Sequence, residues 1–538
     1  MSLATPRHDA LSPRQKSFNS RHPEGTPEGS GCELRGQMLR EYAQHDNNRI
    51  TSITRRYRIL PLLLLALLAS CDRKPAGPEV VLYCAAGVQP PVQEIIAAYE
   101  KETGVAVRVQ YGGSGQLLGN IEASRRGDLF IAGDASYIDI GRKKGLIHEA
   151  IPLATMRPVI LVATGNPKKI ASLNDLLRND VRLALANPDQ ASIGRTLRAL
   201  LQKTGQWGAF EKHATVLKPT VNDLANDVKV GSVDAAIVWD ATARQYPDLA
   251  AIHSDVLDAA VERVTIGVLA DSSQPTRALQ FARFLAAADR GGPVFTKHAF
   301  EAIGGDPWSA TPTMVLYCGA LNRVAVKDTI TRFEQREGCR ITTVYNGCGI
   351  LVAQMKAGQH PDAYLACDVS FVPPVQELFS DPLNISEVAI VIAVPKGNPR
   401  NIAAPADLAR EGIRLGLCHP EQSSIGSLTK KLLDADGTYA RLQPNVRTTS
   451  ATADLLVNQL TVGTLDAVIV SEANVAMNRD KLDVVRIPGA TAIQPYAIGK
   501  QTPYRQLAGR LLEALTSDAS RKHYESLGFI WHAGDAAK

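Results

Sequence analysis

The sequence predicts an α/β protein made of two consecutive copies of one module, and two observations carry that prediction. The first is an internal repeat: residues 81–87 (VLYCAAG) return as 315–321 (VLYCGAL), identical at five of seven positions, at an offset of 234. The second is an alternation of short apolar runs with segments whose apolar residues recur at helical spacing. Matches that continue in order over such a distance indicate a duplicated domain rather than a solenoid with a short period.

Further segments repeat in the same order. Residues 187–194 (NPDQASIG) correspond to 419–426 (HPEQSSIG), and 231–238 (GSVDAAIV) to 463–470 (GTLDAVIV), both at an offset of 232. At 538 residues the chain is also too long for one hydrophobic core. The expected organisation is a leader at 1–70, a tether at 71–78, module 1 at 79–310, a linker at 311–313 and module 2 at 314–535.

Strands and helices alternate within module 1. In chain order, we expect a strand at 80–83, a helix at 91–102, a strand at 105–111, a helix at 116–124 and a strand at 128–132. This βαβ rhythm predicts a mostly parallel sheet with helices on both faces. Ligands of such sheets bind beyond the carboxyl ends of the strands, where loops lead into helices.

Loops rich in small residues follow four predicted strands, after residues 83, 111, 132 and 186. Small side chains let backbone amides approach a ligand, and helix N-termini carry unpaired N–H groups with partial positive charge. A rim of neutral donors suits a compact oxyanion, and several charge-assisted hydrogen bonds would support a Kd below about 1 µM. Alternatively the glycines only form tight turns, but four such loops in each of two modules favour a binding site.

Composition and charge exclude several classes of protein. Hydrophobic residues make up 45% and charged residues 21% of the chain, which excludes a mainly disordered or multi-span membrane protein. Residues 1–70 carry +4 of the net charge of +5, so the remainder has no basic face for nucleic acid. Phosphate-loop, HExxH, GxSxG and CxxC motifs do not occur. We therefore expect no enzymatic activity, no cofactor and no structural metal site.

The N-terminal segment has the features of an export signal. Residues 60–69 (LPLLLLALLA) follow the basic residues 55–58 (RRYR). Ten residues rise only about 15 Å as a helix, half of a bilayer core, so a secretory signal is expected rather than a membrane span. The segment LASC, ending at Cys71, resembles the lipobox of bacterial lipoproteins, which implies a periplasmic protein with a lipid anchor to the membrane. Ordinary signal cleavage is the alternative.

The motifs of module 1 resemble the periplasmic molybdate-binding protein of ABC importers, a type II periplasmic solute-binding protein. The resembling strings are, in order, VLYCAA at 81–86, YGGSGQL at 111–117, DLFIAGD at 128–134, NP at 187–188 and VDAAIVW at 233–239. Module 2 resembles the family less closely but in the same order. The resemblance implies a tandem duplication of the type II periplasmic-binding-protein fold, each module having two α/β lobes, a hinge and an interlobe cleft.

The resemblance also implies a function. The cleft would hold an oxyanion of the molybdate or tungstate type, and the closed form would deliver it to an ABC permease in the membrane. The alternative is a surface sensor or scavenger whose second module binds another anion or a thiophilic metal.

The predicted rim and the resemblance together give candidate ligand-binding residues. In module 1 they are Ala86, Gly87, Gly113, Ser114, Ala191, Ser192, Trp239 and Asp240. In module 2 they are Ala320, Leu321, Cys348, Ser423, Ser424, Ser471 and Glu472. The family's hydroxyl donor falls on Ser114 and on Cys348, and because a thiol is a weak donor we expect weaker oxyanion binding in module 2.

Two other family positions differ in this chain. A first-loop serine falls on Gly87 and Leu321, and a cleft tyrosine falls on Trp239 and Ser471. These departures leave the fold expectation unchanged, but the preferred anion stays open.

Four carboxylates near the loops have two interpretations. Asp240 and Glu472 either approach the ligand or cap the helix that follows them. Asp134 and Asp368 stand just before predicted helices, where an aspartate N-cap contributes about 1 kcal/mol. We expect these last two to be structural.

The cysteines are concentrated in module 2. Cys339 and Cys348 are separated by a predicted strand and lie too far apart to form a disulfide within it. Cys318, Cys348 and Cys367 fall at the carboxyl ends of predicted strands. They either meet as a soft-metal site or are small buried residues at tight positions.

Overall fold

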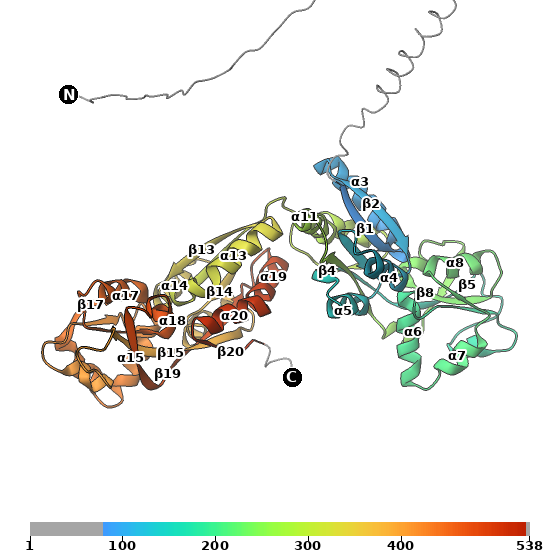
Figure 1. Cartoon of the computed structure of the whole chain (residues 1–538). Helices are drawn as coiled ribbons and strands as arrows, with labels where there is room; N and C mark the ends of the chain where they lie inside the picture. Colours follow the sequence, from blue (N-terminus) through green and yellow to red (C-terminus); the bar gives the residue numbers. More distant parts are fainter. Residues whose placement is uncertain (1–78, 534–538) are drawn as a thin grey trace, which may run out of the picture. The chain divides into compact units, whose positions relative to one another are not determined.

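The computed structural model describes residues 79–533. The predicted leader, the tether and the lipidation site at Cys71 lie outside the described residues, and they stay predictions. Within residues 79–533, no helix has the length and apolar character needed to cross a membrane. Both repeats fold as mixed α/β modules (Figure 1).

The first lobe of module 1 contains a six-stranded sheet with the order β11-β4-β10-β3-β1-β2. Its strands are β1 (Glu79–Ala85), β2 (Ala106–Gly112), β3 (Leu129–Ala132), β4 (Ile147–Met156), β10 (Glu262–Leu269) and β11 (Glu301–Ala302). Its helices are η2 (Ala86–Val88), α3 (Gln89–Thr103), α4 (Ser114–Ser124), α5 (Ala135–Lys143), α11 (Pro275–Ala286) and α12 (Gly291–Lys297). Helix α3 lies alongside β1 and β2 (Figure 1).

The second lobe of module 1 contains a five-stranded sheet with the order β7-β6-β8-β5-β9. Its strands are β5 (Pro158–Ala163), β6 (Leu183–Ala186), β7 (Val216–Lys218), β8 (Ala235–Trp239) and β9 (Leu249–Ile252). Its helices are η3 (Asn174–Leu177), α6 (Ser192–Lys203), α7 (Trp207–His213), α8 (Val221–Lys229), α9 (Asp240–Ala243) and α10 (Asp255–Asp258). The chain passes between the lobes twice, from β4 to β5 and from β9 to β10.

Module 2 repeats this order of elements. Its strands are β12 (Thr313–Gly319), β13 (Arg340–Asn346), β14 (Ala363–Leu365), β15 (Leu383–Pro395), β16 (Leu415–Cys418), β17 (Val446–Ser450), β18 (Ala467–Ser471), β19 (Leu482–Ile498) and β20 (Phe529–Trp531). Its α-helices are α13 (Arg323–Glu337), α14 (Cys348–Lys356), α15 (Ser424–Asp434), α16 (Thr438–Leu442), α17 (Ala453–Thr461), α18 (Glu472–Val475), α19 (Arg505–Leu515) and α20 (Asp518–Ser526). Its 3-10 helices are η4 (Ala320–Asn322), η5 (Val369–Phe371), η6 (Pro373–Leu378), η7 (Pro405–Ala409), η8 (Gln443–Asn445) and η9 (Ala476–Asn478). Strands β15 and β19 run through both lobes without a break, so its strands form one continuous sheet.

Local sequence explains the first helix of the repeat. In α3, Val92, Ile95, Ile96 and Tyr99 recur at helical spacing and are buried against the sheet. The helix ends at Gly104, whose φ of 71° is the left-handed conformation that favours glycine. The helix therefore ends within two residues of its predicted end.

The expectation of a mostly parallel sheet is wrong, because the sheets are mixed. Strand β1 pairs in parallel with β2 and β3, as the βαβ rhythm predicts. Strand β10 instead pairs antiparallel with β3 and β4. It enters the first lobe from the second lobe and so runs in the opposite direction, which the periodicity of the preceding elements does not specify.

A buried ionic contact joins the two modules. Glu337, at the end of α13, accepts a hydrogen bond from Arg510 Nε at 2.6 Å and one from Arg283 Nη1, on α11 of module 1, at 3.1 Å. The three side chains are no more than 9% exposed. Burial raises the pKa of Glu337, but Arg510 and Arg283 outweigh it and hold that pKa below its usual range.

Candidate anion site between two lobes

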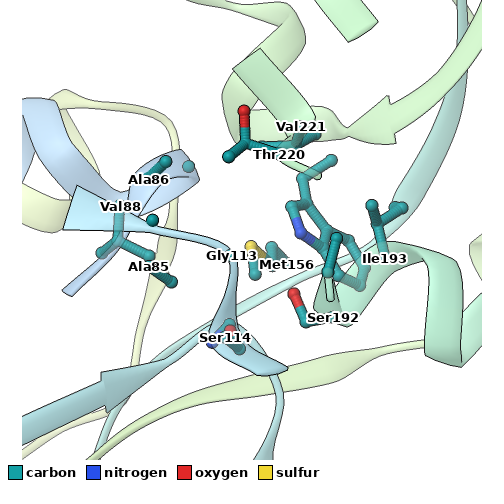
Figure 2. Close-up of a pocket in the computed structure, with 15 residues that line it drawn as sticks. Ala85, Ala86, Val88, Gly113, Ser114, Met156, Ser192, Ile193, Thr220 and Val221 are labelled. Carbon is teal, nitrogen blue, oxygen red and sulfur yellow. Dashed lines mark hydrogen bonds between the residues drawn. The ribbon is translucent and has the colours of Figure 1, made fainter. Parts of the chain in front are cut away.

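A pocket in module 1 lies where the predicted small-residue loops meet (Figure 2). Its lining comes from both lobes: Ala85, Ala86, Gly87, Val88, Gly112, Gly113, Ser114, Gly133 and Met156 from the first, and Ala191, Ser192, Ile193, Thr220, Val221 and Trp239 from the second. The segments that follow residues 83, 111, 132 and 186 therefore share one cavity.

Helices α4 and α6 begin at this pocket without a side-chain cap. Gly113 precedes α4 and Ala191 precedes α6, and neither residue has a side-chain acceptor for the first N–H groups of its helix. Helix α5, which begins just after the lining residue Gly133, is capped as expected: Asp134 Oδ1 accepts the amide of Ser136 at 2.8 Å. The uncapped starts of α4 and α6 leave partial positive charge directed at the pocket.

Two hydroxyl groups supplement these amides. Ser114 Oγ accepts the amide of Gly133 at 3.1 Å, which leaves its hydroxyl hydrogen available to donate. Ser192 Oγ makes no hydrogen bond with any residue of the segment 79–533. Ser114 and Ser192 lie near each other in Figure 2, at the first turns of α4 and α6, and both hydroxyl groups lie beside Gly133.

The two lobes touch beside the pocket, so the cleft is closed. The amide of Gly115 donates to the carbonyl of Gln190 across the cleft at 2.9 Å. A Cβ atom on Gly113 would lie 2.3 Å from the Gln190 carbonyl oxygen and 2.5 Å from that of Pro219. Glycine is thus required at position 113 by the close approach of the second lobe.

The pocket lining contains no charged side chain. Asp240 lies outside it: one carboxylate oxygen accepts the amides of Arg157 at 3.2 Å and Ala241 at 2.8 Å. Burial raises the pKa of Asp240. Because Arg157 lies between β4 and β5, Asp240 fixes one of the two crossings between the lobes.

The candidate ligand-binding residues of module 1 divide into those that line the pocket and one that does not. Those that share the pocket are Ala86, Gly87, Gly113, Ser114, Ala191, Ser192 and Trp239, whereas Asp240 does not. The sequence did not indicate Thr220 and Val221, which follow β7, because that strand is only three residues long. The glycine at the family's first-loop serine position also has a structural reason, since a Cβ on Gly87 would lie 2.8 Å from Val221 Cγ1.

The family model described as bacterial extracellular solute-binding protein matches this chain twice, at residues 80–301 and 314–530. The chain belongs to this family. Each match spans one module, so this solute-binding protein contains two tandem copies of the periplasmic-binding-protein fold.

Each of the following relatives matches a stretch of this solute-binding protein about as long as one module. A binding protein of Haemophilus influenzae is 30% identical over 222 residues, covering 41% of this chain and 90% of that protein. The molybdate-binding protein ModA of Mycobacterium tuberculosis is 28% identical over 251 residues, covering 43% and 91%. Among solved structures, the periplasmic molybdate-binding protein of Azotobacter vinelandii is 14% identical with a TM-score of 0.36, covering 41% of this chain and 98% of that chain.

Module 2 of the solute-binding protein places its predicted residues at the equivalent helix starts. Ala320 and Leu321 form η4, and Ser423 and Ser424 begin α15 without a side-chain cap. All but Ala320 are buried.

The other two candidates of module 2, Ser471 and Glu472, make polar contacts within the protein. Ser471 Oγ caps α18 by accepting the amide of Asn474 at 3.4 Å, and its hydroxyl donates to Asn474 Oδ1 at 2.6 Å. Glu472 neither caps that helix nor stands free, since it pairs with Arg479 at 3.1 Å and Arg486 at 2.8 Å.

The cysteines of module 2 are free and buried, Cys339 and Cys348 among them. No group of three or more His, Cys, Asp or Glu residues within 79–533 could hold a metal ion. The idea that three thiols meet as a soft-metal site is therefore wrong. Cys318 points its sulfur toward the adjacent Gly319 carbonyl at 3.7 Å, whereas Cys348 Sγ accepts the amide of Cys367 at 3.1 Å.

Proposed function

We propose that module 1 captures a small tetrahedral oxyanion of the molybdate or tungstate type and presents it to the permease of an ABC importer. The observation that carries this proposal is the interlobe pocket at which α4 and α6 begin uncapped and in which every lining side chain is uncharged. Backbone amides and hydroxyls donate hydrogen bonds to an anion without a fixed counter-charge, which favours a compact dianion.

Capture would couple binding to closure of the lobes. Donors from the first lobe, at Ser114, and from the second lobe, at Ser192, reach one ion only when the cleft is closed. The chain crossings after β4 and before β10 would act as the hinge. The closed lobes present a surface that the open form lacks, and recognition of that surface by the permease needs no covalent chemistry.

The relatives support the nature of the ligand and the compartment. The mycobacterial relative is named for molybdate binding. Membership of a bacterial extracellular family supports export directed by the segment at 60–69 and attachment to the membrane through lipid on Cys71. The segment and Cys71 both lie outside the described residues. We propose module limits at 79–310 and 314–535 on the same basis.

Replacing Ser114 with alanine tests the site directly. The variant loses one donor to the anion and the acceptor for the Gly133 amide, so we expect about 10- to 100-fold weaker molybdate binding, or about 1.5–3 kcal/mol. Isothermal titration calorimetry with sodium molybdate measures the change. Ser124→Ala, at the exposed end of the same helix, is the matched control and should bind like the natural chain. Equal affinity of the two variants would contradict this placement of the site.

A further inference from the structure

We propose that the Cys367 sulfur takes the place of an oxyanion in the cleft of module 2, so that this module is closed on its own side chain. The chain would then bind one oxyanion, in module 1. This inference rests on the proposed function of the module 1 cleft, because it assigns the same donors to a different occupant.

Cys367 is the counterpart of Gly133. Both follow the third strand of their module, and the strand registers match, since Cys84 pairs with Ile131 as Cys318 pairs with Leu365. The backbone amide at each position donates to the equivalent side chain, Ser114 Oγ in module 1 and Cys348 Sγ in module 2, at 3.1 Å in both cases.

Position 133 faces the cleft. A Cβ atom added to Gly133 would lie 2.4 Å from Ser192 Oγ, the hydroxyl at the start of α6 in the other lobe. The glycine therefore lets Ser192 of the second lobe approach the first lobe closely in module 1. Module 2 has a side chain at this position, and its sulfur is buried, since Cys367 is only 3% exposed.

The groups that act on this sulfur are the expected anion donors. The backbone amide of Cys367 donates to Cys348 Sγ, and the side chain of Cys348, the hydroxyl of Ser424 and the backbone amide of Leu321 are the groups that lower the pKa of the Cys367 thiol. They correspond to Ser114, Ser192 and Gly87 of module 1.

These three donors stabilise the thiolate form of Cys367. They hold the pKa of the Cys367 thiol below its usual range although burial opposes them. In its thiolate form this sulfur would carry the kind of charge that a bound oxyanion brings.

The first loop of module 2 is adapted to the sulfur. Gly319 stands where module 1 has Ala85. A Cβ on Gly319 would lie 2.2 Å from Cys367 Sγ and 2.7 Å from Cys348 Sγ. Module 1 thus has alanine at position 85 and glycine at position 133. Module 2 has glycine and cysteine at the equivalent positions 319 and 367, so the larger residue stands at the other position of the pair.

The stoichiometry of oxyanion binding tests the inference. Calorimetric titration of the full chain with sodium molybdate should give one ion per natural chain and two per chain for Cys367→Gly, while Gly133→Cys should lose the ion of module 1. Cys339→Ala, at a buried cysteine of module 2 outside these contacts, is the control and should retain one ion.

Each other outcome is decisive. Two ions bound by the natural chain, or one ion bound by a folded Cys367→Gly chain, would overturn the inference and leave the proposed function standing. Binding of no ion by any variant would overturn the proposed function itself. Mass spectrometry after thiol alkylation supplies a second test: free Cys348 and Cys367 are expected, and a disulfide between them would contradict a free Cys367 sulfur in the cleft.

Discussion

Replacing Gly113 with alanine should weaken oxyanion binding in module 1 by at least about 100-fold. The added Cβ would lie 2.3 Å from the Gln190 carbonyl oxygen and 2.5 Å from that of Pro219, and both neighbours are backbone atoms. The lobes must therefore separate, which removes the donors of α6 from the ion. Loss of two charge-assisted hydrogen bonds, about 3–6 kcal/mol, accounts for a reduction of this size.

The chain offers two controls for this experiment. Gly119, on the exposed side of α4, has no atom within 4 Å of an added Cβ, so Gly119→Ala should bind normally. Gly347→Ala makes the equivalent clash in module 2, 2.2 Å from the Gln422 carbonyl oxygen, and should leave the binding in module 1 unchanged. The backbone at Gly113 has a φ of −70°, which alanine adopts without strain, so the folded state should persist. Undiminished binding by a folded Gly113→Ala chain would show that the ligand does not need the closed cleft.

Replacing Glu337 with alanine should lower the free energy of unfolding by about 3–5 kcal/mol. The substitution leaves the guanidinium groups of Arg283 and Arg510 buried without their carboxylate, and an uncompensated buried charge is strongly destabilising. Urea denaturation followed by circular dichroism measures the loss. Asp434→Ala breaks the exposed pair of Asp434 with Lys430 and should change stability by less than about 0.5 kcal/mol.

The same carboxylate predicts a dependence on pH. Because the pKa of Glu337 is lower in the folded protein, its stabilising contribution is complete above the ordinary glutamate pKa of about 4.3. It is lost as the pH falls through the lower, folded value. Glu337→Gln removes this titration. As the pH falls below 5, the free energy of unfolding of the natural chain should therefore decrease more than that of the variant. Parallel acid sensitivity of the two proteins would contradict a charged Glu337.

The parts of the fold and site that follow from short-range patterns were predictable from the sequence. The strand, loop and helix at the start of each repeat depend on neighbouring residues, and α3 follows its apolar spacing to the stop at Gly104. The small residues at Gly113 and Ala191 likewise indicate helix starts that a ligand can reach.

Features set by distant partners were not predictable. The direction of β10 is fixed by its return from the second lobe, and Glu472 is neutralised by Arg486, which lies fourteen residues further along the chain. The close approach of Ser192 to Gly133 depends on two lobes meeting. Composition and periodicity report on none of these contacts, because they describe a residue and its near neighbours only.

The proposed function requires that uncharged donors in the module 1 cleft bind an oxyanion. Titrating the full chain with sodium molybdate, tungstate, sulfate and phosphate by isothermal calorimetry tests it most directly. We predict a Kd below about 1 µM for at least one doubly charged tetrahedral oxyanion. The affinity should change little between about pH 6 and 8, since no titratable side chain lines the pocket. Absence of binding for all four anions, or an affinity that follows the titration of a side chain, would contradict the claim.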